Sequence, residues 1–98
     1  SLYGTAVIGV QEARPREAGA QISDSDEHRF LVVSGTSTPA GTHGCQEWFD
    51  LKHPWRMGQG NSRIAPDDVA LMEYAPRYLI ARIHSAVLLF DVCVIHGP

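Results

Sequence analysis

The sequence contains few cysteines, no long apolar run and little charge of either sign. Its 98 residues include 2 cysteines, 8 lysines or arginines and 11 aspartates or glutamates. Cys45 and Cys93 form no CxxC pair, which favours buried, reduced thiols over a disulfide framework. The apolar run at residues 86–90 is far shorter than the roughly 20 residues of a membrane span. A formal net charge of -3 provides no broad basic surface for nucleic acid.

Several signatures of known sites and targeting segments are also missing. His28, His43, His53 and His84 show no HxxH or HExxH spacing, which argues against a zinc site. Glycine-rich residues 58–60 lack the lysine and hydroxyl residue of a nucleotide-binding loop. The first residues show no secretory leader pattern, so we expect an intracellular protein. Because the chain lacks an initial methionine and stops directly after an apolar run, we expect an excerpt of a longer polypeptide.

Short apolar runs between turn-forming residues make up most of the chain. They predict strands at residues 5–10, 29–34, 45–51, 69–74, 77–83 and 87–95, the last two forming a hairpin. The first strand and the end of the last are apolar on both faces, which predicts that both are covered on two sides. Residues 13–27 and 53–66 are expected to be loops. With almost no helical periodicity, this pattern predicts the β-rich half of an α/β sandwich.

Two polar residues follow the ends of predicted strands. Glu12 comes directly after the run that ends at Val10, where a carboxylate could reach a cleft and bind a hard cation such as Mg²⁺. His96 follows Ile95, and histidine at such a position can donate a proton or hydrogen-bond a phosphate oxygen. A solvated glutamate and a partly buried structural histidine remain the alternatives at these two positions. If both are functional, we expect them to share one crevice.

These positions also match a family pattern. Gln11-Glu12-Ala13 after residues 6–10 resembles the strand and metal-binding glutamate of endonuclease/exonuclease/phosphatase (deoxyribonuclease-like) domains. Residues 29–35 and 44–48 look like the next two strands and glycine turn, and residues 77–82 with 91–95 are similar to the paired strands. His96-Gly97-Pro98 resembles the histidine and proline that close this pair. The resemblance spans nearly the whole chain in the family's order.

The resemblance implies that residues 1–98 are the N-terminal part of a two-sheet, deoxyribonuclease-like α/β sandwich. Glu12 would then bind Mg²⁺ (or Mn²⁺), and His96 would contact or protonate the scissile phosphate of a nucleic acid or another phosphodiester. The family also needs an asparagine on an earlier strand, a Gly-Asp-x-Asn motif and late aspartate and histidine motifs, none of which this sequence contains. We therefore expect the chain alone to be inactive.

Two other functions remain open. The chain could be a non-catalytic degenerate or interaction module, with the aromatic residues between Trp48 and Trp55 contacting a partner or stacking on nucleic acid. It could also belong to a phosphatase acting on small phosphoesters such as phosphoinositides, because members of such a family differ mainly in their loops.

Overall fold

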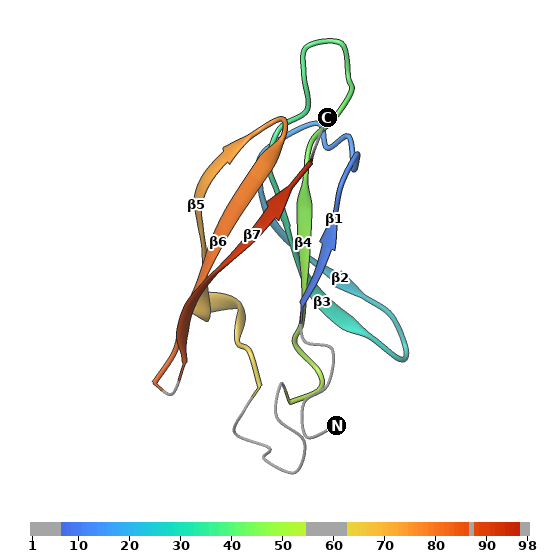
Figure 1. The fold of residues 1–98 in the computed structure, drawn as a ribbon. Helices are drawn as coiled ribbons and strands as arrows, with labels where there is room; N and C mark the ends of the chain where they lie inside the picture. The colour runs from blue at the N-terminus through green and yellow to red at the C-terminus, as the bar shows by residue number, and fades with distance from the viewer. Residues whose placement is uncertain (1–6, 55–62, 87, 97–98) are drawn as a thin grey trace.

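The protein forms two antiparallel sheets that pack on each other through their inner faces. The structure is a computed structural model that describes residues 7–54, 63–86 and 88–96. Sheet A has the strand order β1-β4-β3-β2, and sheet B has the order β5-β6-β7 (Figure 1). The strands of sheet A are β1 (Val7–Val10), β2 (Gly19–Asp24), β3 (Arg29–Ser34) and β4 (Gln46–Asp50). Those of sheet B are β5 (Val69–Ala75), β6 (Tyr78–His84) and β7 (Leu89–Ile95), preceded by the short 3-10 turn η2 (Pro66–Asp68).

Most predicted strands are confirmed, because their apolar alternation matches the pleat of a half-buried sheet. β3 has the predicted bounds, and β4 buries Glu47 and Phe49 on one face while Gln46, Trp48 and Asp50 lie on the other. The hairpin of β6 and β7 is also confirmed, with Tyr78 opposite Ile95 and His84 opposite Leu89. The described part of the predicted loop at residues 53–66 contains only the start of η2, and residues 55–62 lie outside the described ranges.

The prediction of a loop at residues 13–27 is wrong, because this segment contains β2. Every residue of β2 is exposed, so no apolar periodicity marks the strand in the sequence. Backbone pairing with β3, from Gly19 opposite Ser34 to Asp24 opposite Arg29, holds it in place. β2 is an edge strand whose existence depends on hydrogen bonds to its neighbour rather than on burial of its own side chains.

The prediction that the first and last strands are covered on both faces is also wrong. β1 and β7 are edge strands of their sheets. Ile8 is 45% exposed and Ile95 is 67% exposed, so the outer faces of both strands are open in the structure. Cys93 is exposed on β7 as well, whereas Cys45 is buried, so the expectation of two buried thiols holds only for Cys45.

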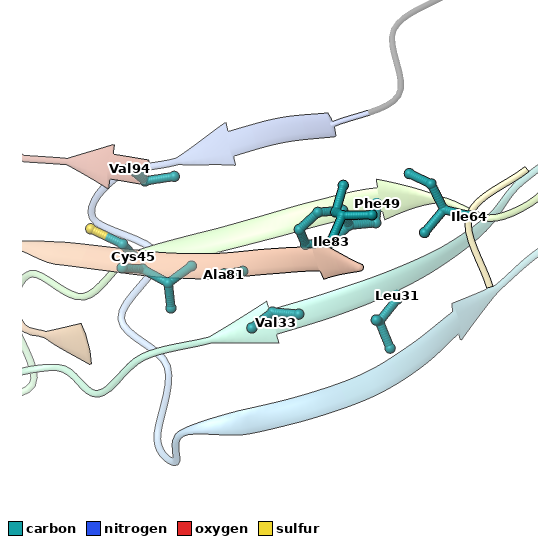
Figure 2. Packing of buried hydrophobic residues seen from close by; sticks show 9 residues of the cluster. Leu31, Val33, Cys45, Phe49, Ile64, Ala81, Ile83 and Val94 are labelled. Carbon is teal, nitrogen blue, oxygen red and sulfur yellow. The ribbon is translucent and has the colours of Figure 1, made fainter. Parts of the chain in front are cut away.

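The core lies between the two sheets and is contributed by both. Figure 2 shows Val33 and Phe49 of sheet A together with Ala81, Ile83 and Val94 of sheet B. β1 and β7 approach closely where Gly9 faces Val94, since a Cβ atom built on Gly9 would lie 2.9 Å from Val94 Cγ2. The protein is thus a small β-rich domain, with η2 as the sole helical turn of the described ranges. No helix there is long and apolar enough to cross a membrane.

Candidate functional site

Three segments that are distant in the sequence meet at one end of the molecule. β1 and β7 both end there and β4 begins there, which is the upper end in Figure 1. Glu12 follows β1, His43 precedes β4 and His96 follows β7. One ligand atom of each of the three side chains lies within 4.8 Å of the others. We call these three residues the strand-end cluster.

The turn that carries Glu12 is hydrogen-bonded to the segment that carries His43. The Ala13 N–H donates to the Gly44 carbonyl at 3.0 Å, and the Arg14 N–H donates to the His43 carbonyl at 3.1 Å. Glu12 and His43 both have positive φ angles, of 54° and 60°. Such angles are uncommon outside glycine and are maintained only where surrounding contacts enforce them. The two backbones therefore place these side chains in a defined arrangement.

His96 is held from two sides. Its backbone N–H donates to the Arg77 carbonyl at 2.7 Å, which extends the pairing of β6 and β7 by one residue. From the turn that follows β1, the Gln11 side-chain amide donates to the Ile95 carbonyl at 2.6 Å. This second bond joins the ends of β1 and β7, so it fixes the distance between the residues that come after them.

The distances within the strand-end cluster converge on one carboxylate oxygen. Glu12 Oε1 lies 2.6 Å from His43 Nδ1 and 3.6 Å from His96 Nδ1. The two imidazole rings are tilted by 54° with their centroids 5.1 Å apart. Glu12 Oε2 points the other way, accepting the His43 N–H at 3.1 Å and lying 3.5 Å from Arg14 Nε.

The electrostatics of the cluster favour an ionised carboxylate. Desolvation alone would raise the pKa of Glu12, but the two hydrogen bonds from His43 and the charges of His43 and His96 outweigh it. The pKa of Glu12 therefore lies below its ordinary value of 4.5. His96 Nδ1 has almost no solvent contact and no hydrogen-bond partner within the described ranges. A buried polar atom without a partner is uncommon, which makes it a candidate ligand atom.

The structure brings together both predicted site residues, Glu12 and His96, and adds His43. Sequence reasoning missed His43 because it lies in a turn-rich segment with no spacing motif to either partner. Of the aromatic residues considered for a binding surface, Phe49 is fully buried in the core, and the Trp48 indole N–H donates to the Gln46 side chain. Trp55 lies outside the described residues. Arg14 borders the Glu12 carboxylate.

A second glutamate has the opposite environment. Glu47 on β4 is fully buried between the sheets, opposite Gly9 on β1 and Val33 on β3. Neither carboxyl oxygen has a hydrogen-bond partner within the described ranges. Burial raises the pKa of Glu47 to about 8, so the carboxyl is mostly protonated at neutral pH.

Fold and site together define a β-rich two-sheet domain with a carboxylate and two imidazoles at the ends of its strands. Comparison with protein-family models, with curated proteins and with solved structures finds no match. The resemblance to deoxyribonuclease-like domains therefore stays a prediction, and the function of the chain has to be inferred from the geometry of the site.

Proposed function

We propose that this chain is part of a metal-dependent phosphodiesterase that hydrolyses nucleic acid, in a deoxyribonuclease-like α/β sandwich of which residues 1–98 form the N-terminal part. The observation that carries the proposal is the 3.6 Å separation of Glu12 Oε1 and His96 Nδ1, two groups 84 residues apart in the sequence. A carboxylate and an imidazole at one strand end can together serve metal binding and proton transfer at a phosphoryl group.

The residues present fit a divalent cation. Glu12 is ionised at neutral pH because the pKa of this carboxyl lies below its ordinary value, and Mg²⁺ sites commonly use one or two carboxylates with waters and phosphate oxygens as the other ligands. Glu12 would therefore hold Mg²⁺ (or Mn²⁺). Such an ion supplies positive charge that stabilises the negative charge developing on a phosphoryl group.

The two histidines would have different roles, His96 on the substrate and His43 on the carboxylate. The His96 ring is 20% exposed and the His43 ring is 28% exposed, so each is partly enclosed while retaining an accessible edge. Protonated His96 would donate a hydrogen bond or a proton to an oxygen of the scissile phosphate. The His43 contact to Glu12 Oε1 would orient the carboxylate.

These groups form part of a hydrolytic site. No further carboxylate or histidine joins the strand-end cluster within the described ranges, so the base that activates water would come from elsewhere in the complete protein. We therefore expect the chain alone to lack hydrolytic activity, and the test uses the complete protein.

The test compares Glu12→Gln and His96→Ala with the control His84→Gln. His84 is an exposed histidine at the end of β6, distant from the cluster in the hairpin register. Cleavage of plasmid and single-stranded DNA in the presence of Mg²⁺ should fall by at least about 100-fold in both site variants, the range of general acid–base contributions, and stay unchanged in the control. Full activity of Glu12→Gln would remove this residue from the site, and an unchanged rate in His96→Ala would refute the role of His96.

A second candidate function is a binding module without catalysis. It is favoured by the exposed apolar side chains on the outer face of sheet B, where Leu89 is 65% exposed and Ile95 is 67% exposed. Exposed apolar groups of this size are typical of surfaces that other protein elements cover. If the complete protein cleaves DNA and both site variants keep wild-type levels of cleavage, another part of the protein catalyses the reaction, and this candidate is favoured.

A further inference from the structure

We propose that Glu12, His43 and His96 together bind one transition-metal ion of the zinc class, in preference to Mg²⁺. The inference concerns the site of the proposed function and rests on it for biological meaning, but metal binding itself requires no hydrolysis. It differs from the expected Mg²⁺ site in using both imidazoles as ligands, so that His96 would coordinate the ion through Nδ1 and only its Nε2–H would remain to hydrogen-bond a phosphate oxygen.

The donor atoms determine the class of ion. Two imidazole nitrogens and one carboxylate oxygen suit Zn²⁺ and its neighbours Co²⁺ and Ni²⁺, whereas Mg²⁺ prefers oxygen ligands only. Two histidines and one glutamate form a known three-ligand set for zinc, with the fourth position left to water or substrate.

The geometry requires only small side-chain movements. Zinc ligands lie about 2.0–2.2 Å from the ion, so neighbouring donor atoms of a tetrahedral site are roughly 3.3 Å apart. The pair Glu12 Oε1 and His96 Nδ1 is already close to this value at 3.6 Å. The pair Glu12 Oε1 and His43 Nδ1 would widen from 2.6 Å, as expected when an ion replaces a hydrogen bond.

Two further observations point to a ligand at this position. His96 Nδ1 has almost no solvent contact and no hydrogen-bond partner within the described ranges, so metal coordination would satisfy it. Glu12 Oε2 is held by the His43 N–H at 3.1 Å and approached by Arg14 Nε at 3.5 Å, which leaves Oε1 directed at both rings. Outer-shell contacts of this kind orient metal ligands in zinc sites.

The test measures metal binding by the purified, tag-free chain. Isothermal titration calorimetry with Zn²⁺ should give one site per chain, and a large excess of Mg²⁺ should not displace it. Bound Co²⁺ should show the intense visible absorption of a tetrahedral site. Zn²⁺ should also shift the imidazole nitrogen signals of His43 and His96 in NMR spectra and leave those of His84 unchanged.

Variants identify the ligands. Glu12→Gln, His43→Asn and His96→Gln should each weaken Zn²⁺ binding by about tenfold or more, while the control His84→Gln keeps the wild-type affinity. Asparagine is chosen at position 43 because it tolerates the positive φ of 60° and so preserves the turn. Circular dichroism of each variant confirms that the fold is retained.

Three results would overturn the inference: no Zn²⁺ binding by the folded wild-type chain, displacement of Zn²⁺ by Mg²⁺, or unchanged affinity in His43→Asn. The proposed function is tested separately. If Zn²⁺ binds through the three residues but the complete protein cleaves no phosphodiester, the inference stands and the proposed function fails. If the complete protein cleaves with Mg²⁺ and the chain binds no Zn²⁺, the reverse holds.

Discussion

Glu12 and Glu47 belong to two regions of one small domain and have opposite surroundings. At the strand ends, Glu12 is 38% exposed and both of its oxygens have polar neighbours, so its pKa is lowered. Between the sheets, Glu47 is fully buried, neither oxygen has a described partner, and burial raises its pKa to about 8. Both glutamates also act on Cys45. The pKa of this thiol is raised first by burial and then by the charges of Glu47 and Glu12.

The contrast separates an ionised carboxylate with oriented hydrogen bonds from a buried carboxyl that has no described partner. An ionised carboxylate with oriented hydrogen bonds can bind a cation without rearranging its surroundings. A buried carboxyl without partners destabilises the fold whenever it ionises. We therefore expect Glu47 to govern the stability of the domain and Glu12 to govern its metal binding. Changes of pH and substitutions at each position test this difference.

The largest effect is expected from the ionisation of Glu47. The folded state binds the Glu47 proton more tightly than the unfolded state does. The stability that comes from this tighter proton binding is therefore fully present at acidic pH and is lost as pH rises through the folded pKa of about 8. From about pH 5 to pH 8, the free energy of unfolding should fall by roughly 1.4 kcal/mol per pH unit, on the order of 4 kcal/mol in all. Urea unfolding at a series of pH values measures this slope.

Glu47→Met supplies the matched variant, because methionine has similar length and no ionisable group. Its stability profile should lack the slope, and at pH 8 it should be more stable than wild type by about 2 kcal/mol or more. Glu17→Gln, at an exposed loop position, should keep the wild-type slope. Parallel profiles for wild type and Glu47→Met would show that Glu47 has a partner or is hydrated.

Much of the fold could be predicted from the sequence wherever one face of a strand is apolar. The alternation around Phe49 places Glu47 on the buried face of β4, and the hairpin of β6 and β7 follows from two apolar runs with a short connection. β2 could not be found, because all of its side chains are exposed and its pairing is a backbone interaction. For β1 and β7 the error was the opposite one, because apolar residues on their outer faces predicted burial, whereas residues such as Ile95 are exposed there.

The site could be predicted in part for a similar reason. Glu12 and His96 each follow a strong apolar strand, so the prediction that strand ends converge brings them together. His43 precedes a strand and lies 31 positions after Glu12, beyond a mostly non-apolar stretch of sequence. Its place depends on backbone bonds between residues 13–14 and 43–44, which no side-chain pattern encodes.

An intermediate effect is expected at Gly44, which supports the strand-end cluster. Gly44 has φ +91°, and a Cβ atom there would lie 2.6 Å from Pro15 Cδ. Its N–H also donates at 2.7 Å to the Pro76 carbonyl, in the turn between β5 and β6. Gly44→Ala should therefore destabilise the domain by on the order of 3 kcal/mol, from backbone strain and overpacking together.

Gly41→Ala is the matched control for backbone strain alone. Gly41 has φ +78°, and nothing lies within 4 Å of a Cβ atom built there. Its substitution should cost only about 1 kcal/mol, measured by the same urea unfolding. Equal costs at the two glycines would mean that the contact with Pro15 relaxes and that the turn does not constrain the cluster.

The smallest effect on stability is expected at Glu12, whose side chain is exposed. Because the pKa of Glu12 is lowered in the folded state, the unfolded state binds its proton more tightly, and this small stabilisation is lost as pH falls below 4.5. NMR titration of the side-chain carboxyl in metal-free buffer should give a midpoint below 4.5 in wild type. In His43→Asn the midpoint should rise, because the hydrogen bond at 2.6 Å is removed. A midpoint at or above 4.5 in wild type, or one unaffected by His43→Asn, would mean that the two residues do not act as a pair, and the contrast between Glu12 and Glu47 would then reflect exposure alone.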